Sequence, residues 1–399
     1  MKKIVLLLLV LAMTFSLTAC GKKDGDSASE NTNVSLKVWG SQDDQEFLNE
    51  RIEAFKAANP KVTWDIQLGV VGEPDAKTKV LEDVSAAADV FAMPDDQVYD
   101  LVKAGALQKV TREADVKYVK DENTGFNEFS VDGTLYGYPF AADNGYFMYY
   151  NSKVLKNVDT LDGILEEAQA QGKKVFMDLS NGWYIASFFL GNGGKLTVEN
   201  GKQICDFDND KGIQAGEAIK KFAAHPAFVT GDDNVLKEGM KSGDIVAAVS
   251  GTWNAKDFKE ILGEGYAAAK LPTFTVDGNQ VQMSSFKSFK GYGVNSQTKF
   301  PVEAMNLAMF LTSEESQNKR FEARQTGPSN IKASQSDAVK ADVALNALIS
   351  QNQHAQAQRA LGSYWTPAEA FGTAMEGKDY SKSVAELLKE MVEQITKAQ

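Results

Sequence analysis

Four carboxylates in the middle of the chain have the spacing of a calcium-binding loop. They stand at loop positions 1, 3, 5 and 12 and are Asp206, Asp208, Asp210 and Glu217. Side chains at these positions supply oxygen ligands to a hard cation. Lys211 replaces the glycine that the sixth position requires, however, and an amphipathic helix pattern begins at Ile213. We therefore expect Asp208 or Asn209 to cap that helix, and we predict neither a metal site nor a cofactor.

The cysteine at position 20 ends a stretch with the pattern of an export signal. Lys2 and Lys3 precede an apolar run, and small residues lead to Cys20. The run is too short to span a membrane and is typical of a cleavable signal. Because it ends in cysteine, it resembles a bacterial lipoprotein signal, although an ordinary secretion signal with an incidental cysteine is the alternative. We predict a signal peptide over 1–19 and a flexible tether over 20–33, with Cys20 carrying a lipid such as palmitate.

Composition limits the possible functions. The formal charge is −12, and removal of Lys2 and Lys3 with the signal makes it −14. Such an acidic chain is a poor ligand for nucleic acid. Only Cys205 remains after Cys20, so no disulfide can form within the chain. The two histidines, His225 and His354, are too few for a histidine-rich metal site and do not favour a Ser-His-Asp triad.

Strands and helices alternate in the first third of the mature chain. Strands are predicted over 34–39, 62–68 and 89–93. A helix that Ser41 caps and Pro60 ends separates the first two, and a short helix ending at Gly105 follows the third. This alternation predicts an α/β fold with mostly parallel sheets. About 365 residues exceed the size of one hydrophobic core, so we expect two domains.

Two later patterns are also specific. The segment 131–134 is a hairpin turn signal. The last helix carries one apolar stripe that predicts docking onto a core. Its members are Val384, Leu387, Leu388, Met391, Val392 and Ile395.

Several short motifs together resemble those of the family-1 extracellular solute-binding proteins, the maltose-binding-protein-like class. Their order, more than any one of them, carries the resemblance, and they cover nearly the whole mature chain. They are Leu36 to Trp39, Asn59-Pro60, Asp89-Val90-Phe91, Tyr136 to Pro139, Met148 to Lys153, Asn192-Gly193-Gly194, Lys241 to Trp253, Lys270-Leu271-Pro272 and Thr326-Gly327-Pro328.

The resemblance implies a two-lobed fold of the periplasmic-binding-protein type II, with discontinuous lobes joined by hinge strands. Lobe 1 would comprise 34–141 plus 286–328, and lobe 2 would comprise 142–285 plus 329–399. The crossings would lie near 140–143, near Phe286 and near Gly327-Pro328. It further implies a monomer, held outside the cytoplasm on the bacterial cell membrane, that delivers a carbohydrate ligand to the permease subunits of an ABC importer.

The resemblance also implies a ligand site of aromatic and polar side chains. Sugars present flat C–H faces to aromatic rings and hydroxyls to fixed polar groups. The aromatic positions that match the family, or adjoin a match, are Trp183, Tyr184, Trp253, Tyr364 and Trp365. Trp39 and Trp64 lie within predicted strands, where core packing is the better interpretation.

The polar positions match less well. Asp43 and Asp96 align with binding aspartates of the maltose binders, and Asp143, or its neighbour Asn144, aligns with a binding glutamate. The family's stacking tryptophan, lysine, arginine and glutamate are absent, and Met93, Asp44, Gln97 and Asn181 stand in their places. A maltodextrin is therefore one expected ligand, and other oligosaccharides fit the same aromatic positions.

Three alternatives stay open. The solute could be a polyol or glycerol phosphate, although Asp44 and Gln97 argue against a phosphate. The protein could capture surface glycans without delivering them to a permease. It could also be a glycosidase that uses two of these carboxylates as acid and nucleophile. No segment resembles a glycosidase motif, so we expect no enzymatic activity.

Overall fold

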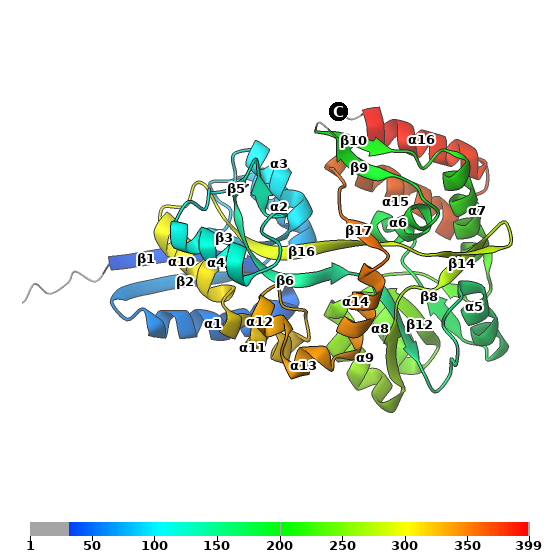
Figure 1. Cartoon of the computed structure of the whole chain (residues 1–399), viewed down its shortest axis with the longest axis horizontal. Helices are drawn as coiled ribbons and strands as arrows, with labels where there is room; N and C mark the ends of the chain where they lie inside the picture. Colours follow the sequence, from blue (N-terminus) through cyan, green and yellow to red (C-terminus); the bar gives the residue numbers. More distant parts are fainter. Residues whose placement is uncertain (1–31, 200, 398–399) are drawn as a thin grey trace, which may run out of the picture.

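The computed structural model describes residues 32–199 and 201–397. The predicted signal peptide, Cys20 and nearly all of the tether lie outside these residues. Within them, no helix is long and apolar enough to cross a membrane. The chain forms two lobes that lie side by side, with two long strands running between them (Figure 1).

Lobe 1 is built on a six-stranded sheet of order β17-β16-β3-β1-β2, with β6 paired to β16. The strands are β1 (Thr32–Gly40), β2 (Val62–Val70), β3 (Val90–Pro94), β6 (Gly137–Gly145), β16 (Ser285–Val294) and β17 (Ala355–Ala357). The small hairpin β4 (Ser130–Val131) and β5 (Thr134–Leu135) stands beside it. Its turn has positive φ at Asp132 (50°) and Gly133 (76°), as the predicted hairpin signal requires.

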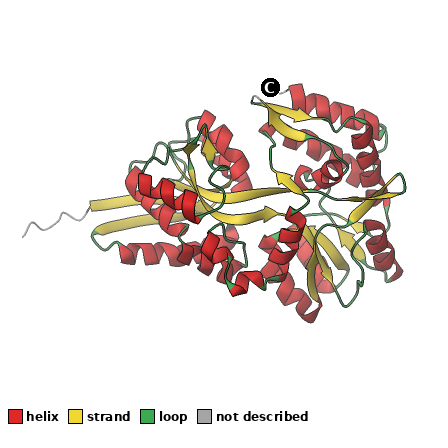
Figure 2. Cartoon of the chain, viewed as in Figure 1, coloured by secondary structure: helices red, strands yellow, loops and turns green. Residues whose placement is uncertain are grey.

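Helices cover both faces of this sheet (Figure 2). They are η1 (Gln42–Asp44), α1 (Gln45–Ala58), η2 (Glu73–Asp75), α2 (Ala76–Glu82), η3 (Asp95–Gln97), α3 (Val98–Lys103), α4 (Glu113–Glu122), α10 (Pro301–Leu311) and α11 (Glu314–Arg324). Apolar side chains from 34–141 and 292–311 form one buried cluster between sheet and helices.

Lobe 2 is built on a five-stranded sheet of order β11-β8-β12-β7-β13. Its strands are β7 (Phe147–Asn151), β8 (Lys174–Phe176), β11 (Phe228–Val229), β12 (Ile245–Ser250) and β13 (Tyr266–Ala269), and two hairpins add β9 (Leu196–Glu199), β10 (Lys202–Cys205), β14 (Thr273–Val276) and β15 (Asn279–Gln282). The helices around it are α5 (Leu161–Ala170), α6 (Gly182–Gly191), α7 (Asp210–Ala224), α8 (Asp233–Ser242), η4 (Thr252–Asn254), α9 (Ala255–Leu262), η5 (Gly263–Gly265), α14 (Val343–Asn352), α15 (Gly362–Glu376) and α16 (Val384–Lys397). Helix α12 (Ile331–Ser334) packs against α11, and α13 (Asp337–Lys340) leads from it to α14.

The last helix docks as its apolar stripe predicts. Val384, Leu388, Met391, Val392 and Ile395 are buried in the larger core cluster of lobe 2. A second cluster of that lobe lies on the other side of its sheet, where α14 and α9 pack.

Strands β6 and β16 pair antiparallel and pass between the lobes (Figure 1). On β16, Phe286 is buried in the core of lobe 2 and Tyr292 in that of lobe 1. A third segment runs beside β6, where the Ala142 N–H donates to the Gly327 carbonyl at 3.0 Å. The expected hinge strands are therefore present. The residue limits proposed for each lobe remain a prediction, and β17, from the segment 329–399, pairs within the sheet of lobe 1.

The expected parallel order holds only in part, and the expected Ser41 cap is wrong. In lobe 1, β1 runs parallel to β2 and β3, and β16 runs parallel to β17 but antiparallel to β3 and β6. In lobe 2, β7 runs antiparallel to β12 and β13. A strand that returns between lobes must reverse direction, and this reversal interrupts the parallel order. Ser41 stands at the N-cap position of η1 without a side-chain hydrogen bond, and α1 begins only at Gln45.

The acidic segment 206–217, whose spacing is like that of a calcium loop, contains the start of helix α7. The Asn209 side chain caps α7 by accepting from the Gly212 N–H at 2.9 Å. Among the residues that the structure describes, no group of three or more His, Cys, Asp or Glu side chains could hold a metal ion.

Candidate functional site

A pair of neighbouring carboxylates follows β3, at the edge of lobe 1 that faces lobe 2. Asp95 and Asp96 begin the 3-10 turn η3, directly after a fully buried strand. The Asp95 side chain is 9% exposed, and its Oδ1 accepts from the Phe289 N–H of β16 at 3.1 Å. The crossing strand therefore holds one carboxylate in place beside the other.

Burial changes the acidity of both groups. It raises the pKa of Asp95 to about 8, and the adjacent Asp96 carboxylate adds to this rise. Burial likewise raises the pKa of Asp96 to about 6, and a hydrogen bond from the Gln358 side chain opposes the rise. The Oδ1 atom of Asp96 is buried without a partner among the described residues. The pair is thus short of cationic and hydrogen-bonding partners.

Two tryptophans of lobe 2 form the aromatic part of the same region. The rings of Trp183 and Trp253 are 5.9 Å apart between centroids and inclined at 38°. Tyr146 supports Trp183 edge-on at 4.5 Å, and its hydroxyl donates to the Trp183 carbonyl at 2.7 Å. Both indoles remain partly exposed, so their faces are available for contact.

Local sequence fixes each tryptophan. Asn181 caps α6, and its Oδ1 accepts from the Trp183 N–H at 3.0 Å. Trp253 lies in η4, one turn after β12 ends. A Cβ at Gly251 would lie 1.9 Å from the Trp253 ring, so only glycine allows that ring to fold back over the backbone. The Trp253 Nε1 donates to Asp233 Oδ2 at 3.2 Å.

A lysine of the crossing strand β16 lies over one of these rings. The Lys290 ammonium of β16 lies 5.7 Å from the centre of the Trp253 ring, within cation–π range. Gln358, between β17 and α15, accepts from the Trp183 Nε1 at 2.8 Å. We call Asp95, Asp96, Trp183, Trp253, Lys290 and Gln358 the seam cluster.

Asp43 and Asp44 lie in a different environment, at the end of β1. Asp44 is 2% exposed and ion-paired to the buried Arg320 and, at 3.4 Å, to Arg324. Asp43 is half-exposed and pairs with Arg324 at 3.0 Å. Arg320 also stacks on the Phe140 ring at 4.0 Å. Asp44 is therefore satisfied within lobe 1, whereas Asp43 keeps an accessible side.

Asp143 and Asn144 bind the crossing segments together. The buried Asp143 carboxylate accepts from the Thr252 hydroxyl at 2.7 Å and from the Gly327 N–H. The Asn144 amide donates to the Ser288 hydroxyl across the β6–β16 pair. Asp143 thereby connects both crossings to the turn that carries Trp253.

The structure brings together Asp96, Trp183 and Trp253 of the predicted site, with Asn181 beside them as a cap. Met93 and Tyr364 are fully enclosed and Tyr184 is nearly so, which places them in the cores. Trp365 is half-buried against Tyr364, with ring centroids 5.1 Å apart. We leave Met93, Tyr184, Tyr364 and Asp44 out of the set that we propose to touch ligand.

Local sequence patterns do not indicate Lys290 or Gln358, and they indicate Asp95 only because it adjoins the predicted Asp96. Lys290 precedes the Gly291-Tyr292-Gly293 return strand, and Gln358 follows a three-residue strand that no alternation pattern indicates. Their places depend on a sheet register that joins distant segments.

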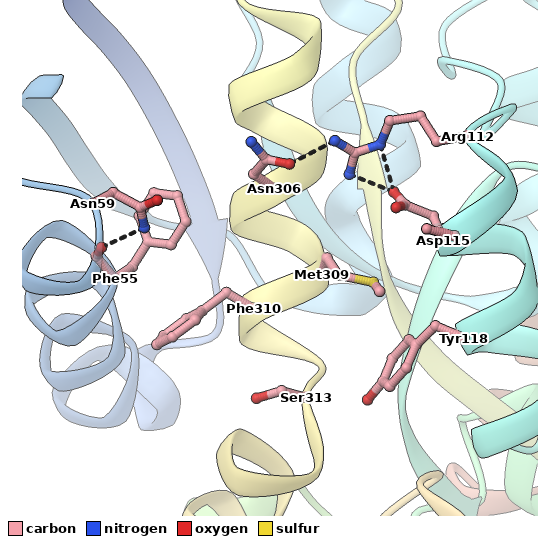
Figure 3. Close-up of a pocket in the computed structure, with 10 residues that line it drawn as sticks. Phe55, Asn59, Arg112, Asp115, Tyr118, Asn306, Met309, Phe310 and Ser313 are labelled. Atoms are coloured by element: carbon pink, nitrogen blue, oxygen red, sulfur yellow. Dashed lines mark hydrogen bonds and ion pairs between the residues drawn. The ribbon is translucent and has the colours of Figure 1, made fainter. Parts of the chain in front are cut away.

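A separate groove of about 470 Å³ opens on lobe 1 between α1, α4 and α10 (Figure 3). The Arg112 guanidinium donates to the Asp115 carboxylate of α4 and to the Asn306 side chain of α10. Phe310, Met309 and Tyr118 supply apolar surface. None of the predicted site residues lines it.

The chain is similar to known proteins in sequence and in fold over most of its length. The family described as "Bacterial extracellular solute-binding protein" matches residues 50–347. A galactooligosaccharide-binding protein of Bacillus subtilis (strain 168) is 28% identical over 94% of this chain and 93% of its own. Two solved structures are similar over 92% of this chain. One, determined with acarbose, is 30% identical at a TM-score of 0.85 over 99% of its chain. The other, the unliganded maltodextrin-binding protein MalE1 of L. casei BL23, is 25% identical at 0.77 over its full chain.

Proposed function

Because this chain belongs to the bacterial extracellular solute-binding protein family, we propose that it captures an oligosaccharide between its two lobes and delivers it to the permease of an ABC importer. It changes no bond in the sugar. The observation that carries the proposal is the seam cluster, in which two partly exposed indoles from lobe 2 oppose two under-paired carboxylates from lobe 1.

The two halves of the seam cluster suit the two surfaces of a sugar ring. Indole faces cover C–H surface, and carboxylate oxygens accept from hydroxyls. Asp96, which is partly exposed, would supply one such acceptor. Since the halves come from different lobes, a sugar between them stabilises the closed arrangement through contacts that either lobe alone lacks.

Two classes of oligosaccharide are the leading ligands. A galacto-oligosaccharide is suggested by the Bacillus subtilis relative and a maltodextrin by the L. casei neighbour. Both classes have the same flat faces and hydroxyl groups, so the seam cluster suits either one. We propose an oligosaccharide and leave its linkage to measurement.

The lipid at Cys20 is part of the proposed function. An anchor and the 20–33 tether would keep the receptor at high effective concentration near its permease. The protein would work as a monomer on the outer side of the cell membrane.

A thermal-shift screen tests the proposal directly. Ligands that bind only the folded protein raise its Tm, by an amount that grows with concentration relative to Kd. We expect a rise with galacto-oligosaccharides or maltodextrins and none with glycerol phosphate or polyols. Calorimetry on the best sugar should then give one site per chain. A Tm that no oligosaccharide raises, or steady release of reducing ends from a bound sugar, would contradict the proposal.

A further inference from the structure

We propose that Asp143 is a positioning residue and not a ligand contact, and that its buried carboxylate holds the turn that carries Trp253 against the segments that join the lobes. The role rests on the proposed function, since it concerns how one indole of the seam cluster is oriented for sugar. Asp143 is 3% exposed, and its hydrogen-bonding partner Thr252 is 2% exposed. Neither side chain therefore offers surface to a ligand.

A β-bulge in β6 frees the segment 142–143 from pairing with β16. Asn144 of β6 lies opposite Ser288 of β16, whereas Lys290, two residues further along β16, lies opposite Ala141. Three steps on β6 thus match two steps on β16, so β6 carries one extra residue at this point. The extra residue interrupts the ladder and lets the freed groups bond elsewhere.

Both strands use the freed groups outside the ladder. The Ala142 N–H donates to the Gly327 carbonyl at 3.0 Å, and the Asp143 carboxylate accepts from the Gly327 N–H. On β16, the Phe289 N–H has no partner on β6 and donates to Asp95 Oδ1 at 3.1 Å. The bulge therefore replaces pairing within the sheet by contacts with the third crossing segment and with the seam cluster.

Close packing holds the Asp143 carboxylate at this place. A Cβ on Gly327 would lie 2.9 Å from the Asp143 Cβ and 2.9 Å from the Leu345 Cδ2 of α14. Only glycine allows the third segment to pass between the crossing strand and this helix of lobe 2. Asp143 is thus fixed relative to two of the segments that join the lobes.

The same carboxylate oxygen reaches the turn of lobe 2. The Thr252 hydroxyl donates to Asp143 Oδ2 at 2.7 Å, and Trp253 follows directly in η4. Asp233 of α8 holds the Trp253 Nε1 from the other side. Among the hydrogen bonds of the residues that the structure describes, the Thr252–Asp143 bond is the one that ties η4 to a crossing segment. Asp143 therefore fixes the turn from the hinge, and Asp233 fixes it from within lobe 2.

This connection makes the orientation of the indole depend on the hinge. Rotation of one lobe against the other changes the backbone of the crossing segments. Because the Asp143 carboxylate bonds to both Gly327 and Thr252, such a change is passed to the turn of Trp253. Without the Thr252 bond the indole is less preorganised, and ordering it on binding costs affinity.

Substitutions of Thr252 test the role without altering the carboxylate. Thr252→Val keeps the shape of the side chain and removes its hydroxyl, so we expect sugar affinity to fall about threefold to tenfold. Thr252→Ser keeps the hydroxyl and should bind sugar as the parent protein does. Thr312→Val is the matched control, because it removes a buried hydroxyl of lobe 1 that bonds only to carbonyls of α10. Normal sugar affinity in Thr252→Val would overturn the role.

Asp143→Ala, alone and combined with Thr252→Val, separates positioning from direct contact. If the carboxylate acts through the Thr252 hydroxyl, the double variant should bind sugar about as well as Asp143→Ala, because the interaction is already lost. If the carboxylate touches the sugar itself, the two losses should multiply. Losses that multiply would refute positioning, and the two Thr252 variants decide the matter alone if Asp143→Ala does not fold.

A measurement without sugar distinguishes this inference from the proposed function. In fluorine NMR of protein labelled with fluorotryptophan, each of the five tryptophans gives a resonance, and Trp253→Phe identifies that of Trp253. We expect this resonance to shift or broaden in Asp143→Ala and Thr252→Val and to stay near its parent position in Thr252→Ser and Thr312→Val.

The two proposals then fail in different ways. A Trp253 resonance that is the same in Thr252→Val as in Thr252→Ser would overturn the positioning role, even if sugar binding were confirmed. A displaced resonance in a protein whose Tm no oligosaccharide raises would support the positioning role and refute the sugar.

Discussion

At the residue scale, the seam cluster combines groups whose ordinary properties are changed by their surroundings. Trp183 and Trp253 are held by a cap, a hydrogen bond and a glycine, so their faces are preorganised. Asp95 is buried, its neighbour Asp96 is partly exposed, and the pKa of each carboxyl is raised. Rigid rings and under-paired acids are the features of a site prepared for a polar ligand with flat faces.

The first residue-scale prediction concerns Trp253→Ala. The change removes a partly exposed ring that packs 5.9 Å from Trp183, so we expect sugar affinity to fall about tenfold or more. Calorimetry with the best sugar from the screen measures it. Trp64→Phe, which alters a partly buried indole packed against the core of lobe 1, is the control. Unchanged affinity would show that Trp253 does not contact the ligand.

The second residue-scale prediction concerns stability and pH. Asp95 has a pKa of about 8 when folded and about 4 when unfolded, so the folded protein binds more protons between these values. Its contribution to the free energy of unfolding therefore decreases as pH rises from about 4 to about 8. Asp95→Asn should reduce this decrease and be more stable than the parent at pH 8, on the order of a few kcal/mol.

Urea unfolding at pH 5, 6, 7 and 8 measures the effect of Asp95→Asn. The exposed Glu260 provides the control, because Glu260→Gln should leave the pH profile unchanged. Parallel profiles for the parent and Asp95→Asn would mean that the Asp95 carboxylate is not strained in the folded protein.

At the element scale, close approach of backbones positions the helices that hold the site. Helix α15, which follows the Gln358 segment, packs against the loop that leads to α6 and Trp183. A Cβ at Gly372 would lie 1.8 Å from the Leu179 carbonyl oxygen. Glycine is needed there because the helix lies directly on that loop.

The element-scale prediction follows from this contact. Gly372→Ala forces α15 away from Leu179, and overpacking of this kind costs about 1–3 kcal/mol. We expect a lower Tm and weaker sugar binding, measured by thermal unfolding and calorimetry. Thr373→Ala, one residue later on the exposed side of the same helix, should change neither. A Gly372→Ala protein as stable as the parent would show that the two elements can separate at no cost.

At the scale of the whole molecule, two lobes with separate cores are joined by β6, β16 and the segment at Gly327. Asp143 of β6 ties that strand and the Gly327 segment to the turn of Trp253. Motion of one lobe against the other therefore acts directly on the seam cluster, which is what a receptor that signals occupancy requires.

The whole-molecule prediction concerns the anchor. If Cys20 carries the lipid, Cys20→Ala should release the protein from membranes into the soluble fraction, because the thiol that bears the acyl chain is gone. Fractionation of cells that express each form measures this. Sugar binding of the released protein should equal that of the parent, since the seam cluster is unaltered. Cys20→Ala protein that stays on the membrane would refute the anchor.

Local rules predicted much of this protein from its sequence. The hairpin at 131–134, the helix ending before Gly105, the cap at Asn209 and the stripe of α16 each depend on neighbours within one or two turns. Motif order predicted the family and the two-lobed fold.

Only the tertiary structure decided which of these groups meet. Asp44 and Asp96 have the same side chain and both follow a strand, yet Arg320 pairs with the first, whereas desolvation raises the pKa of the second to about 6. Gln358 reaches Trp183 from 175 residues away. Sequence patterns record the periodicity and propensity of near neighbours, whereas the partner of a buried charge depends on long-range register, which no local pattern contains.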